Sequence, residues 1–250
     1  YNGEFPEDIA LYGLSFNTLG PFGVALQGEY SYRPKMPVQL SAINLLGELL
    51  ANGAAPIPNS GVGNADDSPL PPGTNLQGFK RVEFHQAQLT ATHTLGPRIG
   101  ANQVVAVAEA GYTYQRLPNG MAFNAAGTDF SSPTPGAAGF QTNNSYGYRA
   151  VLTAAYLNAI GSINLTPRIA FSHDLRGVSA TFNQGVKAAS IGVNAAYQNN
   201  IQADISYTNF FGGENYNLTG VGSSNLGPTS TTNNPLSDRD FIAATVSYSF

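Results

Sequence analysis

The sequence contains no cysteine. The chain therefore forms no disulfide and offers no thiolate to a zinc or redox site, which excludes disulfide-stapled scaffolds and cysteine-based metal sites. This absence also suits a protein of the bacterial envelope, which is an oxidising compartment.

Charged residues are scarce, at 10% of the chain, against about 25% in an ordinary soluble domain. Hydrophobic residues make up 42% and the mean hydropathy is −0.12, so uncharged polar residues replace the missing charge. The net charge is −4 and the pI is about 5.2, so the chain has no stripe of basic residues that could neutralise phosphates. This argues against nucleic acid as a partner. This composition indicates that part of the surface contacts a solvent other than water.

Long apolar runs and catalytic motifs are also missing. No stretch approaches the ~18 apolar residues of a transmembrane helix. The GxSxG, HExxH, P-loop and dinucleotide motifs do not occur. The three histidines, His85, His93 and His173, have no metal-ligand spacing. We therefore expect no enzyme activity, no catalytic or metal-binding residue and no cofactor.

What the sequence does contain is alternation of apolar and polar residues. Near the end of the chain, Ile242, Val246 and Tyr248 fall on one side while Thr245 and Ser247 fall on the other. A period of two predicts a β-strand with one apolar face. The same pattern predicts nine strands, at residues 9–19, 22–33, 78–95, 98–115, 146–165, 168–176, 186–198, 201–210 and 239–250. The strand at 146–165 is longer than a spanning strand needs and its faces disagree, which predicts either a bulge or an extension of the strand beyond the bilayer.

The connections between these strands alternate in length. Tight turns are predicted at TLGPFG (18–23), TLGPRIG (94–100), NLTPRIA (164–170) and QNN (198–200), and long connections at 34–77, 116–145, 177–185 and 211–238. All sixteen prolines fall outside the predicted strands. Transmembrane barrels have short periplasmic turns and long extracellular loops. We therefore predict an all-β fold, an antiparallel barrel in the Gram-negative outer membrane; a soluble β-sandwich is the alternative.

The two faces of the predicted strands suggest two groups of functional residues. An aromatic girdle facing lipid is predicted at Tyr30, Tyr32, Tyr112, Tyr114, Tyr197, Tyr207 and Tyr248. Charges on the polar face could line a constriction of the lumen: Glu29, Arg33, Glu109, Arg149 and Asp204. Alternatively, these charges pair with one another and only keep the lumen ordered.

One segment of the long 34–77 connection has helical rather than strand spacing. Leu40, Ile43, Leu46 and Leu50 recur along KMPVQLSAINLLGELLANG, which predicts a short amphipathic helix near 37–52. This helix could gate the barrel or contact an apolar ligand, or it could simply pack on the barrel rim.

The strand count predicts that the barrel continues beyond these residues. If the tight turns are periplasmic, the first strand runs down and the ninth leaves Phe250 in the periplasm. Bacterial single-chain barrels have an even number of strands. We therefore expect residues 1–250 to be the C-terminal portion of a single barrel domain, with about 14 to 18 strands in total, or alternatively a ten-stranded barrel. No signal peptide is apparent at Tyr1.

Two stretches resemble a known family. PEDIALYGLSFNTLGPFGVALQGEYSYRPKMPVQL (6–40) and the terminal FIAATVSYSF resemble the C-terminal half of Gram-negative outer-membrane barrels that are catalogued as a domain of unknown function and are common in Pseudomonas-like proteobacteria. The resemblance implies an envelope transport partner and growth on hydrophobic compounds. It supplies no catalytic residue.

Together these observations predict a channel or transport protein for small hydrophobic molecules. A scaffold barrel that holds a lipoprotein or envelope complex is one alternative, and a lipid-modifying enzyme is another. The expected partners are outer-membrane lipid and, through Tyr248 and Phe250, the outer-membrane assembly machinery, because an aromatic C-terminus resembles the signal that this machinery reads.

Overall fold

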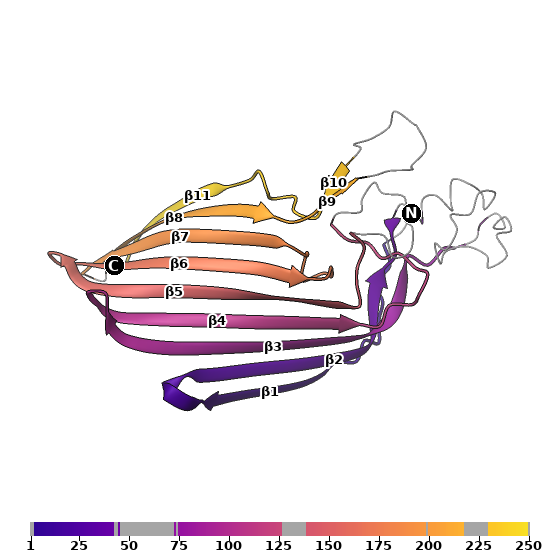
Figure 1. Ribbon diagram of the computed structural model, residues 1–250, viewed down its shortest axis with the longest axis horizontal. Coiled ribbons are helices and arrows are strands. Elements are labelled where there is room, and N and C mark those ends of the chain that lie inside the picture. Colours follow the sequence, from indigo (N-terminus) through magenta and orange to yellow (C-terminus); the bar gives the residue numbers. More distant parts are fainter. Residues whose placement is uncertain are drawn as a thin grey trace.

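The computed structural model describes residues 3–42, 45, 73, 75–126, 139–198, 200–217 and 230–249. Nine antiparallel strands form one sheet in the order β1-β2-β3-β4-β5-β6-β7-β8-β11 (Figure 1). The strands are β1 (Tyr12–Leu19), β2 (Ala25–Gln39), β3 (Phe79–Arg98), β4 (Ala101–Gln115), β5 (Asn144–Ile160), β6 (Ile163–Arg176), β7 (Val186–Tyr197), β8 (Ile201–Gly212) and β11 (Phe241–Tyr248). A two-stranded sheet pairs β9 (Asn215–Asn217) with β10 (Ser230–Thr232). The prediction of an all-β, nine-stranded antiparallel fold is confirmed.

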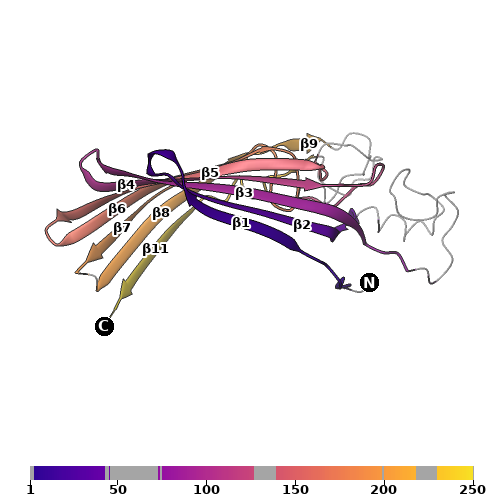
Figure 2. The ribbon, with the colours of Figure 1, turned by 90° about the horizontal axis from the view of Figure 1, so that it is seen from below.

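The sheet is a meander in which each strand pairs with the next. The connections β1–β2, β3–β4, β5–β6 and β7–β8 lie at one end, called here the turn end, and the longer connections lie at the other, the loop end (Figure 1). Figure 2 shows the sheet as one twisted layer. Within the described residues no second sheet covers it, so the sandwich alternative is not supported, and β1 and β11 each pair on one side only. No described helix is long and apolar enough to cross a membrane.

Two strand boundaries differ from the prediction at the third turn. The chain turns at residues 161–162, and NLTPRIA lies inside β6. Pro167 pairs with Val193 of β7. On the other side of β6, Arg168 pairs with Thr153 of β5 and the next pair joins Leu165 to Tyr156. Pro167, which has no N–H to donate, is therefore unpaired with β5. The predicted bulge in β5 is confirmed by a register shift between Tyr156 and Ile160.

The prediction that proline stays outside strands is therefore wrong. Pro34 and Pro37 also lie in β2, and Pro97 lies near the end of β3. In β2 the register shifts between Arg33 and Met36, so Pro34 falls within an irregularity of the ladder. Bulges and strand ends tolerate proline because a ladder hydrogen bond is already missing there.

The loop predicted from residue 34 and the helix predicted from residue 37 both begin too early. Residues 34–39 belong to β2, whose Val38 pairs with Lys80 of β3. Leu40 is 1% exposed, because it packs in a small core with Val38, Val82 and Phe123 and pairs with Phe123. The first helical hydrogen bond joins the Leu45 N–H to the Ser41 carbonyl. Ile43, Leu46 and Leu50 lie outside the described residues.

The pairing register gives the sheet one apolar and one polar face. Directly opposed residues point to the same side of a sheet, and successive residues point to opposite sides. Across β5, β6, β7 and β8 one such row joins Leu152, Ile169, Ile191 and Tyr207, whereas the neighbouring row joins Thr153, Arg168, Gly192 and Ser206. The apolar residues of neighbouring strands therefore lie side by side on one face of the sheet, and the polar residues lie side by side on the other. The apolar face is uncovered, with Ile191 61% and Val246 77% exposed.

At the loop end, an acidic side chain joins β8 to the start of β11. The Asp240 carboxylate accepts hydrogen bonds from Asn209 Nδ2 at 2.7 Å, from the Tyr207 hydroxyl at 2.7 Å and from the Phe210 N–H at 3.1 Å. These donors favour the ionised form and hold the pKa of Asp240 below its usual value of 3.8.

This arrangement predicts a loss of stability in acid. A lowered folded-state pKa means that the contribution of Asp240 is complete above its unfolded-state pKa and disappears as the pH falls through the folded-state value. Below about pH 4, the wild-type protein should therefore lose more thermal stability than an Asp240→Asn variant, whose side chain does not titrate. Thermal unfolding followed by circular dichroism from pH 7 to pH 2 measures this difference. Parallel curves for the two proteins would contradict the assignment.

Candidate functional site

All seven tyrosines predicted as a girdle lie on the apolar face. The register aligns Tyr30 and Tyr32 of β2 with Tyr112 and Tyr114 of β4 through β3. Toward the turn end, Tyr197, Ile201 and Tyr248 share a row. The seven are thus brought onto one surface; contact with lipid remains a prediction.

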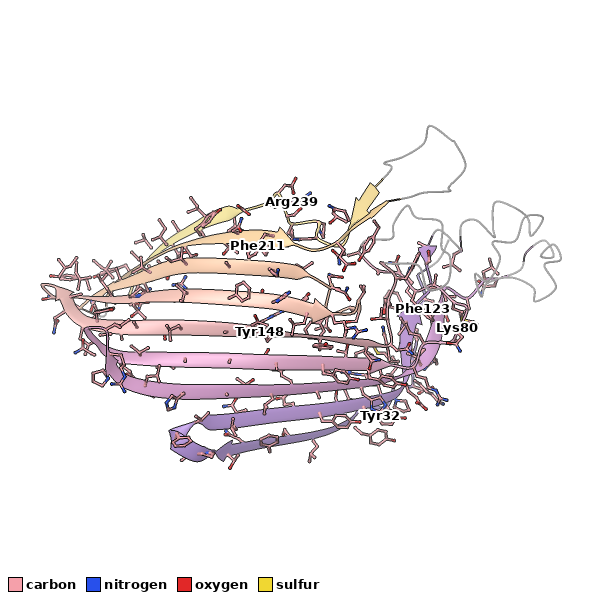
Figure 3. All side chains as sticks on the ribbon, in the orientation of Figure 1. Tyr32, Lys80, Phe123, Tyr148, Phe211 and Arg239 are labelled. Atoms are coloured by element: carbon pink, nitrogen blue, oxygen red, sulfur yellow. The ribbon has the colours of Figure 1, made fainter. Side chains whose placement is uncertain are left out.

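The aromatic residues at the loop end contact one another. His85 stacks on Tyr32 with ring centroids 4.6 Å apart and lies 5.6 Å from the ring of Tyr114. His85 Nδ1 and the Tyr30 hydroxyl form a 2.6 Å hydrogen bond. Figure 3 labels Tyr32 at this end of the sheet and Tyr148 on β5. His85 therefore packs among the tyrosines of this face and bonds to one of them.

On β5 the distance between aromatic residues is close to a membrane thickness. Tyr148 and Tyr156 lie on the apolar face with Leu152 midway between them. Eight residues span about 27 Å along a strand, or about 21 Å along the membrane normal for a strand tilted by about 40°. This is near the ~25 Å apolar band of outer-membrane barrels.

The five charged candidates all lie on the polar face, but only some are close together. Glu109 and Arg149 are directly opposed on β4 and β5. Glu29 is opposed to Gln88, whose amide donates to Glu109 at 2.7 Å. Arg33 lies farther toward the loop end, 5.8 Å above the ring of Phe84. Asp204 lies toward the turn end, opposite Thr245.

Asp204 forms an ion pair, but its partner is Arg168, which is not one of the five candidates. Its two carboxylate oxygens accept hydrogen bonds from Arg168 Nη1 at 2.6 Å and Nη2 at 2.8 Å. The guanidinium lies over Gly192, where a Cβ would come within 2.9 Å of it. Arg168 was missed because NLTPRIA was interpreted as a turn, although Asn164, Thr166 and Arg168 alternate with Leu165, Pro167 and Ile169 in strand fashion.

Glu109 and Arg149 behave differently. The Glu109 carboxylate accepts from Gln88 at 2.7 Å and from the Thr90 hydroxyl at 3.1 Å, both through Oε2. Within the described part of the chain, Arg149 forms neither a hydrogen bond nor an ion pair, and it is exposed. Its guanidinium is thus available to a ligand.

The connection between β6 and β7, residues 177–185, folds onto the polar face. The Ser179 and Ser145 hydroxyls are 2.8 Å apart, and the Ser145 and Thr113 hydroxyls 2.5 Å apart. All three residues are buried. Sequence analysis identified this segment only as a loop. The Ser179–Ser145 contact joins residues 34 positions apart in the sequence, and no local pattern indicates it.

Phe182 in this loop lies over two glycines. A Cβ on Gly111 would meet the Phe182 ring at 2.9 Å, and a Cβ on Gly147 would meet it at 3.0 Å. Gly111 and Gly147 are directly opposed on β4 and β5. Because these two residues have no side chains, the Phe182 ring can lie directly on the sheet, and Phe182 is only 7% exposed.

Further hydrogen bonds fix the loop in place. The Asn183 N–H donates to Asp174 Oδ2 at 2.8 Å, and the Gln184 amide donates to Glu214 at 2.7 Å. Asn233, which is fully buried, donates to the Gln184 carbonyl at 2.9 Å. The β6–β7 loop is thereby tied both to the sheet and to the segment after β8.

An open pocket lies where this loop meets the polar face. Its walls come from β3, β4, β5, the end of β6 and the loop. The polar and charged side chains lining it include Gln88, Glu109, Arg149, Asp174 and Thr181, and Phe182 forms one side. Three charged side chains of the polar face, Glu109, Arg149 and Asp174, therefore meet at this pocket.

Comparison with known protein families gives a match over the whole chain. The family model described as "Protein of unknown function (DUF1302)" covers residues 1–250. No curated protein and no solved structure matches the chain.

Proposed function

The chain belongs to the DUF1302 family of proteins of unknown function, and on that premise we propose that it forms part of the wall of an outer-membrane barrel through which small molecules pass. The observation that carries this proposal is the alignment of nine strands into one apolar face and one polar face. Water would surround a soluble sheet on its uncovered side, and an apolar surface of this extent would be costly there. Lipid removes that cost.

The two faces support opposite surroundings. The apolar face, with aromatic residues toward both ends, matches the outer surface of a membrane barrel. The polar face, with Glu109, Arg149 and the Arg168–Asp204 pair, matches a water-filled lumen. The inward-folded β6–β7 loop would narrow that lumen, as loops do in channels that select their solutes.

The free edges of β1 and β11 support closure by further strands. Each edge leaves N–H and C=O groups without sheet partners among the described residues, and such groups are costly in the hydrocarbon of a bilayer. We propose that additional strands pair with both edges and complete an even-stranded barrel. The C-terminal strand, β11, would then be the segment that the assembly machinery recognises.

The preference for hydrophobic solutes rests on the family resemblance and on the leucine-rich segment after Leu40. Leu40 itself is covered, and residues 46–50 lie outside the described part of the chain. The described pocket is charged, which favours polar solutes instead. No specific contact among the residues that the structure describes favours a scaffold for a lipoprotein or transport partner, or a lipid-modifying activity.

Solute entry into liposomes tests the proposed function. The full-length protein is purified, reconstituted into phospholipid liposomes and exposed to small solutes of graded size. We expect entry of solutes at rates that increase with the amount of protein, and no entry into protein-free liposomes. Liposomes that contain correctly folded protein and remain closed to all of these solutes would overturn the proposal.

A further inference from the structure

We propose that the pocket between the β6–β7 loop and the polar face binds small zwitterions, solutes that carry both an ammonium and a carboxylate group. This inference rests on the proposed function, because it names the solute class that the constriction selects. Its basis is the placement of one unpaired guanidinium between two carboxylates in a single pocket.

The guanidinium of Arg149 provides the site for the carboxylate of the solute. Arg149 projects from β5 directly opposite Glu109, yet among the described residues no hydrogen bond or ion pair joins it to Glu109 or to any other side chain; its charge acts on the nearby Asp174 without direct contact. A guanidinium binds a carboxylate through two parallel hydrogen bonds. The paired Arg168, by contrast, already makes this bidentate contact with Asp204.

The two carboxylates provide the site for the ammonium group. Glu109 uses only Oε2 for its contacts with Gln88 and Thr90, and Asp174 uses only Oδ2 for the Asn183 N–H. Each carboxylate therefore keeps one oxygen without a partner in the described structure. The internal hydrogen bonds hold these carboxylates in position before a ligand arrives, which lowers the entropic cost of binding.

The combination of charges favours a zwitterion over other simple solutes. An anion would approach Arg149 but meet two negative groups, and a simple cation would approach the carboxylates but meet Arg149. A neutral solute would leave the charges of the pocket partly desolvated and unpaired. A zwitterion satisfies both signs, and the Phe182 ring offers an apolar edge for the carbon skeleton.

The test compares two solutes of similar size in liposomes that contain the full-length protein. The probes are L-proline, a zwitterion, and erythritol, which is uncharged. We expect faster entry of L-proline in the wild type. Arg149→Gln should reduce the ratio of the two rates by about tenfold, the effect of losing one charge-assisted hydrogen bond. Arg149→Lys should restore part of the preference because it keeps the charge.

Arg98→Gln is the matched control. Arg98 is an exposed arginine at the turn end of β3 and is not among the residues that line the pocket. It makes the same charge change and should leave the ratio as in the wild type. Equal entry of both probes in the wild type, or a ratio unchanged by Arg149→Gln, would overturn the zwitterion site while the channel itself stands. Entry of neither probe would overturn the channel and the site together.

Discussion

Replacement of Ile169 by arginine should destabilise the protein in a bilayer by about 2–4 kcal/mol and reduce its assembly in the membrane. Ile169 lies in the middle of β6, is 53% exposed and is opposed to Leu152 and Ile191 on the apolar face. A charge at this depth would have to enter hydrocarbon. Urea unfolding of the protein in phospholipid vesicles measures the loss.

The adjacent residue offers a matched control. Ala170 lies on the polar face, opposed to Val151 and Ser190. Ala170→Arg introduces the same side chain one position along the same strand, but into the proposed lumen. It should be tolerated far better than Ile169→Arg. Similar losses from the two variants, or a larger loss at Ala170, would contradict the assignment of the faces.

The second large effect is expected at the ion pair of the polar face. Asp204→Ala should lower the free energy of unfolding, because it leaves the guanidinium of Arg168 without its bidentate partner. Both side chains are about one-third exposed, at 33% and 31%. Water therefore compensates part of the loss, and the cost stays below that of breaking a fully buried pair.

A double-mutant cycle isolates the interaction itself. The unfolding free energies of Arg168→Ala, Asp204→Ala and the double variant are measured in the same vesicles. We expect the double variant to be more stable than the sum of the two single losses implies. Strict additivity would mean that the pair contributes nothing, and the charges of this face would then be independent of one another.

Strand alternation was enough to predict nine strands and the residues of each face. The observed register joins these faces across the sheet without a reversal, as for Tyr30 of β2 and Tyr112 of β4. This success has a physical reason. A slip of one residue would turn an entire strand's apolar side chains toward the wrong surface, so the pattern strongly specifies pairing.

The errors arose where proline was given too much weight. Pro167 sits in a ladder that is interrupted on one side, and Pro34 sits in an irregularity of β2. The turn predicted at NLTPRIA puts the start of β6 at residue 168 instead of Ile163, and Arg168, the partner of Asp204, is not among the predicted site residues. The observed turn at Gly161–Ser162 contains no proline that would mark it in the sequence. The register shift just before it in β5 also interrupts the alternation, so the end of that strand is not evident from the pattern.

The pocket could not be predicted because it depends on long-range contacts. Glu109 and Arg149 were both identified as candidates, but their lack of an ion pair is a property of the folded geometry. The docking of Phe182 on Gly111 and Gly147 likewise requires that β4, β5 and the β6–β7 loop be brought together. Each of the two glycines alone is compatible with an ordinary strand.

The most direct test of the account asks which face of the sheet contacts lipid. Because the chain has no cysteine, single cysteines at Ile191 and Ser190, neighbours on opposite faces of β7, can each carry one fluorescent label. In vesicles that contain nitroxide-labelled lipid, the account predicts strong quenching of the label at position 191 and little quenching at position 190. Equal quenching at both positions, or stronger quenching at 190, would contradict the claim that the apolar face lies against the membrane.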